Sequence, residues 1–413
     1  MSGREGRQLG IALVGAGDMG VRHLRAYAEM EKDGTFTPRL TGLIDPDAEL
    51  VRRRVSWYAE ATGRELISYP DVEAALNAAE VEALDLAAPS HLHDVLAIQA
   101  MEAGRHVMVE KPLALSVARG RQVVEVAQAT GLAVGVGHNY RFFPSNRAVR
   151  HIIEAGIIGR PYFCVAQYLG PSGGMVARSW AEGTVKADAH DVRVTGSRAA
   201  VAMGVHETDL LRYWFGEVDE AYGVIRTFDT DVRTDGGDRL KNNNDDTAMA
   251  TLTFASGMVA QYTISFAGSG SPARSRSIQG AEGNLLSTDW ASWDGGVVTG
   301  RAGRRDAGDF VRDYISELTG AEQRQLLPPG SHQGELTIAF DDPMRYGIAA
   351  ELEQFAAAAV TGEQPEVNAE EGLKSDAVAL AVLESAYAGR PVRVADVESG
   401  ALADWQRSVA KDA

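Results

Sequence analysis

The sequence predicts an α/β domain with a doubly wound parallel sheet, followed by an α+β domain built on an antiparallel sheet. Three observations lead to this fold class. Short apolar runs alternate with helical patterns through the first third of the chain, a glycine-rich turn follows the first run, and strand-rich segments dominate after about residue 150. With 413 residues, of which 45% are hydrophobic, the chain is long enough for two domains with separate cores.

The first third predicts five strands separated by helices. Because helices connect consecutive strands, the strands are expected to lie parallel in one sheet. The predicted strands are Leu9–Val14, Arg39–Ile44, Ala83–Ala87, His106–Val109 and Ala133–Val136. The predicted helices are Gly20–Glu31, Ala48–Thr62, Asp71–Asn77, Leu92–Ala103 and Ser116–Thr130.

The later part of the chain predicts strands joined by turns, and two late helices. Residues 255–257, Ala-Ser-Gly, indicate a hairpin turn between two antiparallel strands. The predicted strands are Tyr162–Leu169, Val218–Phe228, Thr247–Phe254 and Met258–Phe266, and the helices are Arg345–Val360 and Glu370–Tyr387, before an extended piece at Pro391–Val394. Polar loops are expected at Leu240–Asp246 and Gly268–Arg276, and mostly irregular structure at 294–335.

A glycine motif, Gly-Ala-Gly-Asp-Met-Gly at residues 15–20, follows the first strand and opens a helix. In this context the glycines allow a tight turn and close backbone approach to a pyrophosphate at the helix N-terminus. The second strand ends at Asp45, an acid that would accept hydrogen bonds from a ribose and repel a 2′-phosphate. The sequence therefore predicts an NAD site, with NADP less favoured; the alternative for Asp45 is that it caps the following helix.

Residues 110–112, Glu-Lys-Pro, follow the apolar run 106–109 directly. Charges at the end of a buried strand are costly unless they have a function, and ligands bind at the carboxyl ends of strands in open α/β sheets. Lys111 is one of only six lysines, and a partly buried lysine can lose its proton whereas arginine effectively cannot. The alternative interpretation is a solvated strand end. Pro112 is a candidate for a cis peptide bond.

Composition restricts the partners. A formal charge of −17 argues against nucleic acid or an anionic membrane as the main partner. The single cysteine, Cys164, excludes an internal disulfide and a cysteine metal cluster, and it is expected in the core. No signal-peptide or membrane-span pattern is found, so a cytoplasmic protein is expected. The nine histidines show no helical HxxxH pair with an acid partner, and no metal site is predicted.

With these elements placed, the chain resembles the Gfo/Idh/MocA oxidoreductases, the family of glucose–fructose oxidoreductase and inositol dehydrogenase. The resemblance spans about residues 8–395. It rests on the glycine motif, on Glu-Lys-Pro, and on three further segments: 88–93 (APSHLH), 137–142 (GHNYRF) and 204–211 (GVHETDLL).

The resemblance implies a two-domain oxidoreductase. Residues 1–140 would form an NAD(P)-binding Rossmann domain. Residues 141–413 would form a substrate-binding and oligomerisation domain with a large, open, mostly antiparallel sheet, and its C-terminal helices would pack back on the first domain. The implied assembly is a homo-dimer or homo-tetramer. The implied chemistry is hydride transfer between a nicotinamide and a hydroxyl carbon of a sugar, cyclitol or sugar derivative.

The resemblance also implies site residues. Lys111 and His206 would be catalytic, since oxidising an alcohol needs a base for the hydroxyl proton; a structural histidine is the alternative for His206. The implied cofactor-binding set is Gly15, Gly17, Asp18, Met19, Gly20, Asp45, Pro89, His93, Glu110 and Lys111. The implied substrate-binding set is Lys111, Tyr140, Arg141, His206 and Asp209. Three residues have structural alternatives. Arg141 is equally expected to form an interdomain salt bridge, and His93 is equally expected to cap a helix start. Trp214 is expected to pack in the core rather than to stack on a sugar.

One position departs from the family pattern. Family dehydrogenases commonly carry an aspartate four residues before this histidine, and Ala202 stands there in this chain. Other acids close in sequence are Glu207, Asp209, Asp188 and Asp191, and a basic pair is formed by Lys186 and His190. The missing acid leaves two alternatives to a simple dehydrogenase. One is a redox-neutral enzyme that oxidises its substrate transiently before elimination, hydrolysis or epimerisation, and the other is a non-catalytic NAD-binding regulator.

Overall fold

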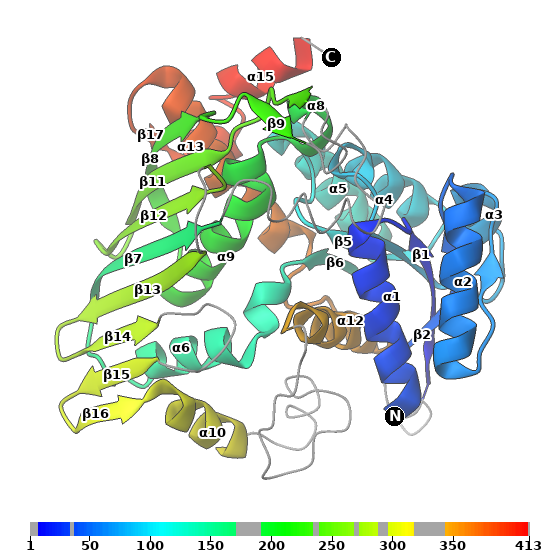
Figure 1. Cartoon of the computed structure of the whole chain (residues 1–413), viewed down its shortest axis with the longest axis horizontal. Helices are drawn as coiled ribbons and strands as arrows, with labels where there is room; N and C mark the ends of the chain where they lie inside the picture. Colours follow the sequence, from blue (N-terminus) through cyan, green and yellow to red (C-terminus); the bar gives the residue numbers. More distant parts are fainter. Residues whose placement is uncertain are drawn as a thin grey trace. The chain divides into compact units, whose positions relative to one another are not determined.

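The computed structural model describes residues 7–33, 37–170, 191–233, 239–267, 272–287, 296–317 and 343–411. The chain forms two compact units (Figure 1). The first, the nucleotide unit, contains residues 1–114, 118–142 and 320–373, and the second, the sheet unit, contains residues 115–117, 143–319 and 374–413.

The nucleotide unit is built on a six-stranded parallel sheet in the order β3-β2-β1-β4-β5-β6. All five strands predicted for this part are confirmed. Their bounds are Leu9–Val14 (β1), Pro38–Ile44 (β2), Ala83–Leu86 (β4), His106–Glu110 (β5) and Val134–Gly137 (β6). The sixth, β3 (Ile67–Ser68), is a two-residue edge strand that sequence patterning did not find.

Helices cover this sheet and close its core. They are α1 (Asp18–Asp33), α2 (Ala48–Thr62), α3 (Val72–Leu76), α4 (His93–Glu102), α5 (Val117–Thr130) and α12 (Pro343–Thr361), with short 3-10 turns η1 (Ser90–Leu92) and η2 (Asn139–Phe142). Although α12 is distant in sequence, its apolar side chains, including Leu352 and Phe355, share one core with Leu24 and Tyr27 of α1. Each such buried side chain contributes about 1.5–3 kcal/mol, so α12 is an integral part of the nucleotide unit.

The sheet unit contains a nine-stranded sheet in the order β16-β15-β14-β13-β7-β12-β11-β8-β17 (Figure 1). Neighbouring strands are antiparallel except β7 and β12, which pair in parallel. The bounds are Pro161–Leu169 (β7), Val218–Arg226 (β8), Thr247–Phe254 (β11), Val259–Ser265 (β12), Ala273–Gly280 (β13), Asn284–Ser287 (β14), Val297–Gly300 (β15), Gly303–Asp306 (β16) and Val392–Arg393 (β17). A separate pair consists of β9 (Asp231–Arg233) and β10 (Arg239–Lys241).

Helices flank this sheet, and α9 contacts β12 on one of its faces. The helices are α6 (Pro144–Glu154), α8 (Val192–Thr195), α9 (Gly204–Phe215), α10 (Ala307–Glu317), α14 (Val394–Glu398) and α15 (Asp404–Lys411), with a π-helical turn η4 (Arg198–Met203) before α9. A further helix, α13 (Ala369–Ala388), begins in the nucleotide unit and continues into the sheet unit. Cys164 is buried at 1% exposure, as expected, and burial raises the pKa of its thiol.

Two expectations for this unit are wrong. The predicted loop 268–276 overlaps β13, and the segment predicted as irregular contains β15, β16 and α10. In β13 only Arg276 and Ile278 are buried, and the charge of Arg276 is paired with Glu207. With a charged residue at one of its two buried positions, the strand lacks the apolar alternation that marks a half-buried strand. In β16 every residue is exposed, so no apolar face marks it in the sequence. The predicted loop 240–246 is also shorter, because β10 occupies its start.

Candidate functional site

The three glycines of the motif occupy the turn between β1 and α1, each under a different constraint. Gly15 has φ +104°, and a Cβ there would lie 2.4 Å from the Ala87 carbonyl oxygen. A Cβ on Gly20 would lie 1.9 Å from the Gly15 oxygen, so the turn closes only with glycine. Around Gly17, in contrast, no atom lies within 4 Å of an added Cβ. The turn therefore leaves open space at Gly17, where the backbone of a dinucleotide-binding turn approaches the pyrophosphate.

Asp45 joins this turn to the end of β2. Its Oδ2 accepts a hydrogen bond from the Ala16 N–H at 2.9 Å, and its Oδ1 accepts one from the Asp47 N–H at 2.9 Å. The side chain that caps α2 belongs to Asp47, which accepts from the Leu50 N–H at 3.0 Å. The alternative in which Asp45 caps the helix is therefore wrong. Asp18 and Met19 form the first turn of α1; Asp18 lies 3.5 Å from Arg22, and Met19 packs on the core.

The ends of β4 and β5 are tied together by His93. In this buried side chain Nδ1 lies 2.7 Å from the Pro112 carbonyl oxygen and Nε2 lies 2.8 Å from the Ala88 carbonyl oxygen. Burial lowers the pKa of His93. Pro89 immediately precedes η1, and the Lys111–Pro112 bond is cis, as the sequence suggested. His93 thus connects two segments that follow strands, rather than capping a helix start.

Glu110 and Lys111 lie side by side but differ in exposure. Glu110 is 4% exposed, whereas Lys111 is half-buried. One carboxylate oxygen of Glu110, Oε2, accepts from the Lys111 backbone N–H at 3.1 Å, and Oε1 lies 3.2 Å from His23 Nε2. Burial alone would raise the pKa of Glu110, but the His23 hydrogen bond and the Lys111 charge outweigh it and lower that pKa. Glu110 is therefore an anion beside the lysine.

Tyr140 and Arg141 lie in η2, after β6, and both are buried. The Arg141 Nη2 atom lies 3.5 Å from Oε2 of Glu371, and both residues belong to the nucleotide unit. The ion pair found for Arg141 is thus within one unit.

His206 lies in the first turns of α9 and is 4% exposed. Asp209, one turn further, accepts a hydrogen bond from Ser375 Oγ at 2.8 Å. Glu207 accepts from Arg276 at 3.1 and 2.6 Å, so its charge is already paired. Of the acids near Ala202 in sequence, Glu207 is therefore unsuited to replace the missing aspartate as a base.

The remaining candidates fall into two groups. Asp191 caps α8 through the Arg193 N–H, and its side-chain hydrogen bond from Arg193 lowers its pKa to about 2, which makes it a structural acid. Asp188, Lys186, His190 and Trp180 lie outside the described residues.

Trp214 packs in the core, as the sequence predicted. Its Nε1–H donates to the Asn146 carbonyl oxygen at 2.9 Å, and its side chain is 5% exposed.

Asp245 organises the backbone just before α9. Its carboxylate accepts from the backbone N–H groups of Arg198, Ala199 and Ala200, at 2.9, 2.9 and 3.0 Å. These groups begin η4, the π-helical turn that contains Ala202 and leads into His206. The sequence indicated only a polar loop at this point, because spacing alone cannot show which helix start a distant carboxylate reaches.

Sequence reasoning also missed a buried polar cluster in the nucleotide unit. It consists of His23 and Tyr27 of α1, Asp85 of β4, Glu110 of β5 and Glu351 of α12. A signal existed for two of these: Asp85 interrupts the apolar run Ala-Leu-Asp-Leu-Ala, and Glu351 follows three buried apolar residues in α12. A charge inside an apolar run is costly unless it has partners, so such a residue marks a buried network.

The nucleotide unit has the parts of a dinucleotide-binding domain that serves redox chemistry. A glycine turn leaves room for a pyrophosphate, an acid lies at the end of β2, and a half-buried lysine follows β5. The class of protein defined by these features is a nicotinamide-dependent oxidoreductase.

Comparison with known proteins gives the same answer. Residues 9–138 match the family described as "Oxidoreductase family, NAD-binding Rossmann fold", and residues 146–286 match the "GFO/IDH/MocA C-terminal domain". Together these segments cover well over half of the chain. The chain therefore belongs to the Gfo/Idh/MocA family of NAD(P)-dependent oxidoreductases, and NAD is its cofactor.

Two relatives and one solved structure illustrate the similarity. Levoglucosan dehydrogenase of Pseudarthrobacter phenanthrenivorans is 27% identical over 61% of this chain, and the alignment covers 66% of that relative, just under two thirds. 1,5-Anhydro-D-fructose reductase of Ensifer adhaerens is 28% identical over 81% of this chain and 85% of its own length. A levoglucosan dehydrogenase structure in complex with NADH and levoglucosan has a TM-score of 0.73 at 23% identity, covering 94% of this chain and all of that one. At this identity the structural match shows the fold.

Among the described residues, none of the helices is both long and apolar enough to span a membrane.

Proposed function

We propose that this protein is an NAD-dependent dehydrogenase or reductase that acts on a hydroxyl carbon of a sugar, cyclitol or sugar derivative. The observation that carries the proposal is Lys111, half-buried directly after β5 in the unit that contains the glycine turn. Relatives named levoglucosan dehydrogenase and 1,5-anhydro-D-fructose reductase support a carbohydrate substrate. Bound NAD would supply the hydride acceptor or donor, and the residues of the chain would manage the proton.

Lys111 and His206 are the proposed proton-handling residues. The Lys111 ammonium would orient the substrate hydroxyl and stabilise negative charge that develops on its oxygen, and His206 would accept the hydroxyl proton. Both side chains are shielded from bulk water to a degree that strengthens such interactions. Tyr140, Arg141 and Asp209 are the further proposed substrate contacts, and Pro89 and His93 would line the nicotinamide end of the cofactor site.

A redox-neutral reaction is the second candidate, and Ala202 favours it. Alanine can neither accept a proton nor orient an imidazole, and Glu207 is already paired with Arg276. In such an enzyme bound NAD would take a hydride from the substrate, elimination, hydrolysis or epimerisation would follow, and the NADH would return the hydride to the intermediate. This cycle would not need the same proton acceptor at position 202 as a net dehydrogenation. A non-catalytic NAD-binding regulator is a third and weaker candidate, because it has no need for Lys111 and His206.

A substrate panel separates these candidates. The purified protein is incubated with NAD and a series of sugars and polyols, and NADH is followed by its absorbance. A simple dehydrogenase produces NADH with at least one substrate. Product found by chromatography without NADH identifies redox-neutral chemistry, and tight NAD binding without any product identifies a regulator.

Asp45 is proposed to select NAD. We expect Asp45→Asn, which retains an acceptor for the Ala16 N–H, to weaken NAD binding by about tenfold, because a hydrogen bond to a charged group contributes about 1.5–3 kcal/mol. NADP binding should weaken less or improve, since the repulsion of its 2′-phosphate is removed. Dissociation constants for both cofactors, with Asp47→Asn as the control, test this. An unchanged NAD to NADP ratio would refute the assignment.

The open face of the nine-stranded sheet is proposed as a homo-oligomer interface. Its outward positions carry exposed Phe163, Val259, Tyr222, Met249 and Leu286 among threonine, serine and glutamine side chains. Exposed apolar patches of this kind mark interaction sites. The molar mass in solution should correspond to a dimer or tetramer, and Met249→Lys should lower it; a monomeric wild-type protein would contradict the proposal.

A further inference from the structure

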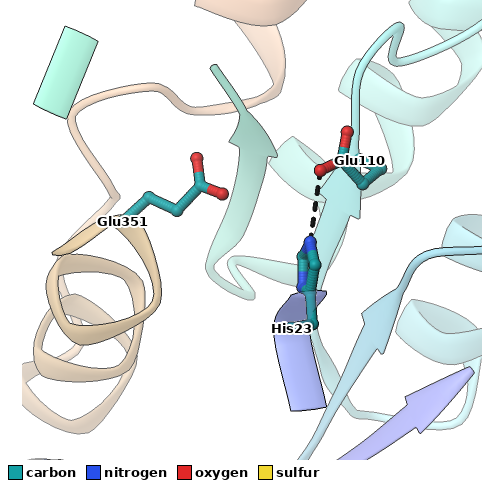
Figure 2. A group of neighbouring side chains, drawn as sticks. All are labelled: His23, Glu110 and Glu351. Atoms are coloured by element: carbon teal, nitrogen blue, oxygen red, sulfur yellow. Dashed lines mark hydrogen bonds and ion pairs between the residues drawn. The ribbon is translucent and has the colours of Figure 1, made fainter. Parts of the chain in front are cut away.

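A buried cluster of ionisable side chains in the nucleotide unit includes Glu110, which accepts a hydrogen bond from the Lys111 backbone N–H. His23 and Tyr27 reach it from α1, Asp85 from β4, Glu110 from β5 and Glu351 from α12, and none of the five is more than 4% exposed. His23 Nδ1 lies 2.8 Å from Asp85 Oδ2, and Tyr27 donates its hydroxyl proton to the same oxygen at 3.1 Å. Figure 2 shows the other edge of the His23 ring, which faces Glu110, and the Glu351 side chain that extends toward both residues.

The geometry around His23 determines how many protons it carries. Its two ring nitrogens each face a carboxylate oxygen, Nδ1 at 2.8 Å from Asp85 and Nε2 at 3.2 Å from Glu110. Ionised carboxylates only accept hydrogen bonds, so both nitrogens must donate, and the ring is an imidazolium. Burial opposes this charge, but Asp85 and Glu110 outweigh burial and hold the pKa of His23 well above its ordinary value.

Unlike Asp85 and Glu110, Glu351 makes no hydrogen bond to the His23 ring. Among the described residues neither of its carboxylate oxygens has a hydrogen-bond partner, and it is 2% exposed. One of these oxygens lies within 4.8 Å of the nearest facing atoms of His23 and Glu110. An ionised Glu351 would therefore be a buried third anion beside Glu110. Burial first, and then the Glu110 charge, raise the pKa of Glu351 well above its ordinary value.

We propose that Glu351 is a neutral carboxylic acid in the folded enzyme, and that Glu351 and His23 position Lys111 by acting through Glu110. The connection is the Glu110 carboxylate, which faces His23 with one oxygen and accepts from the Lys111 backbone N–H with the other. A neutral Glu351 leaves Glu110 as the anion next to the lysine. An ionised Glu351 would repel Glu110 and compete with it for the Lys111 ammonium. The inference rests on the proposed function, in which Lys111 acts on the substrate hydroxyl.

A bound cation is the rival explanation, since His23, Glu110 and Glu351 offer donor atoms within 4.8 Å of one another. The direct contact of His23 Nε2 with Glu110 favours the proton, because a metal ion at that nitrogen would replace the hydrogen bond. The two explanations make opposite predictions for glutamine at position 351. Glutamine reproduces the shape and neutrality of a protonated glutamate, whereas it is a poor substitute for an anionic metal ligand.

The first test does not depend on activity. The charged groups around Glu351 are Glu110, His23, Asp85 and Lys111, and Tyr27 and His93 complete the titratable surroundings. If Glu351 keeps its proton on folding, only the unfolded chain releases that proton above about pH 4.5, so the contribution of Glu351 to wild-type stability falls as pH rises. The ratio of the unfolding constants of wild type and Glu351→Gln should then rise by up to about tenfold per pH unit above pH 5. The control Glu363→Gln, at an exposed residue, should give a flat ratio. A flat ratio for Glu351→Gln would overturn the proposal.

The second test uses turnover and metal content. Glu351→Ala and His23→Gln should each lower kcat by about 10–100-fold with little change in KM, because a misplaced reacting group is costly. Glu351→Gln should recover most of the kcat that the alanine variant loses. An equal loss of kcat in Glu351→Ala and Glu351→Gln would overturn the proposal. So would a metal analysis that finds one divalent ion per wild-type chain and none in Glu351→Gln. If Lys111→Ala retains wild-type turnover, the proposed function fails instead, and the unfolding data still determine whether Glu351 is protonated.

Discussion

Replacing Lys111 with alanine is expected to reduce kcat by about 10²–10⁴-fold, the range that a positioned acid or base contributes. NAD affinity should stay close to the wild-type value, because Asp45 and the glycine turn remain in place. Steady-state kinetics on the best substrate of the panel, together with a fluorescence titration of NADH binding, measure the two effects separately. Comparable turnover in the variant would remove Lys111 from the mechanism.

Lys111→Arg refines this experiment, since arginine keeps the positive charge but cannot release a proton at accessible pH. If the lysine acts only as a cation, the arginine variant should recover part of the activity. If it also transfers a proton, both variants should be equally inactive. Arg52→Ala removes an exposed cation on α2 and is the matched control for a general loss of charge.

Gly17→Ala is expected to abolish most NAD binding while leaving the fold intact. No atom lies within 4 Å of the added Cβ, so the unliganded protein has room for it. The methyl group would instead occupy the space that the pyrophosphate needs, and overpacking of this kind costs about 1–3 kcal/mol, or about 10–100-fold in affinity. The unfolding temperature of the unliganded variant should therefore match that of the wild type, whereas its dissociation constant for NAD should be higher. An alanine variant that binds NAD as the wild type does would contradict the placement of the pyrophosphate.

Gly20→Ala is the contrasting substitution in the same turn. Its Cβ would lie 1.9 Å from the Gly15 carbonyl oxygen, so the backbone of the β1–α1 turn must shift to make room for the methyl group in the folded protein. The expected result is a loss of about 3 kcal/mol or more in stability, visible as a lower unfolding temperature even without cofactor. A Gly20 variant as stable as Gly17→Ala would show that the turn adjusts more easily than its geometry indicates.

The nucleotide unit was predictable from the sequence because its signals are local. Each strand is a short apolar run and each helix follows directly, so β1, β2, β4 and α2 were placed within one residue of their observed bounds. The glycine turn and Asp45 likewise depend on residues that are close together in the chain. The sheet unit was harder, since strands such as β13 and β16 carry charged residues where a pattern search expects apolar ones.

The interactions within the site were less predictable than its residue types. Glu110 and Lys111 could be selected from their position after a strand, but the contact between Glu110 and His23 connects a strand to a helix far away in the sequence. Glu351 joins the same cluster from α12, and Asp245 reaches the start of η4 from a loop. Such contacts depend on tertiary packing, which the spacing of residue types in one sequence does not encode.

The membership of α12 in the nucleotide unit has a consequence for biosynthesis. During translation the six strands and α1 emerge first, but the helix that buries Leu24 and Tyr27 is completed only when residue 361 leaves the ribosome. Until then the nascent unit must carry an uncovered apolar surface, an ionisable cluster without its fifth member, and a Thr37 that lacks its hydrogen bonds to Glu353. A fragment that ends near residue 142 should therefore aggregate or recruit chaperones, and the nucleotide unit becomes stable only after most of the polypeptide has been made.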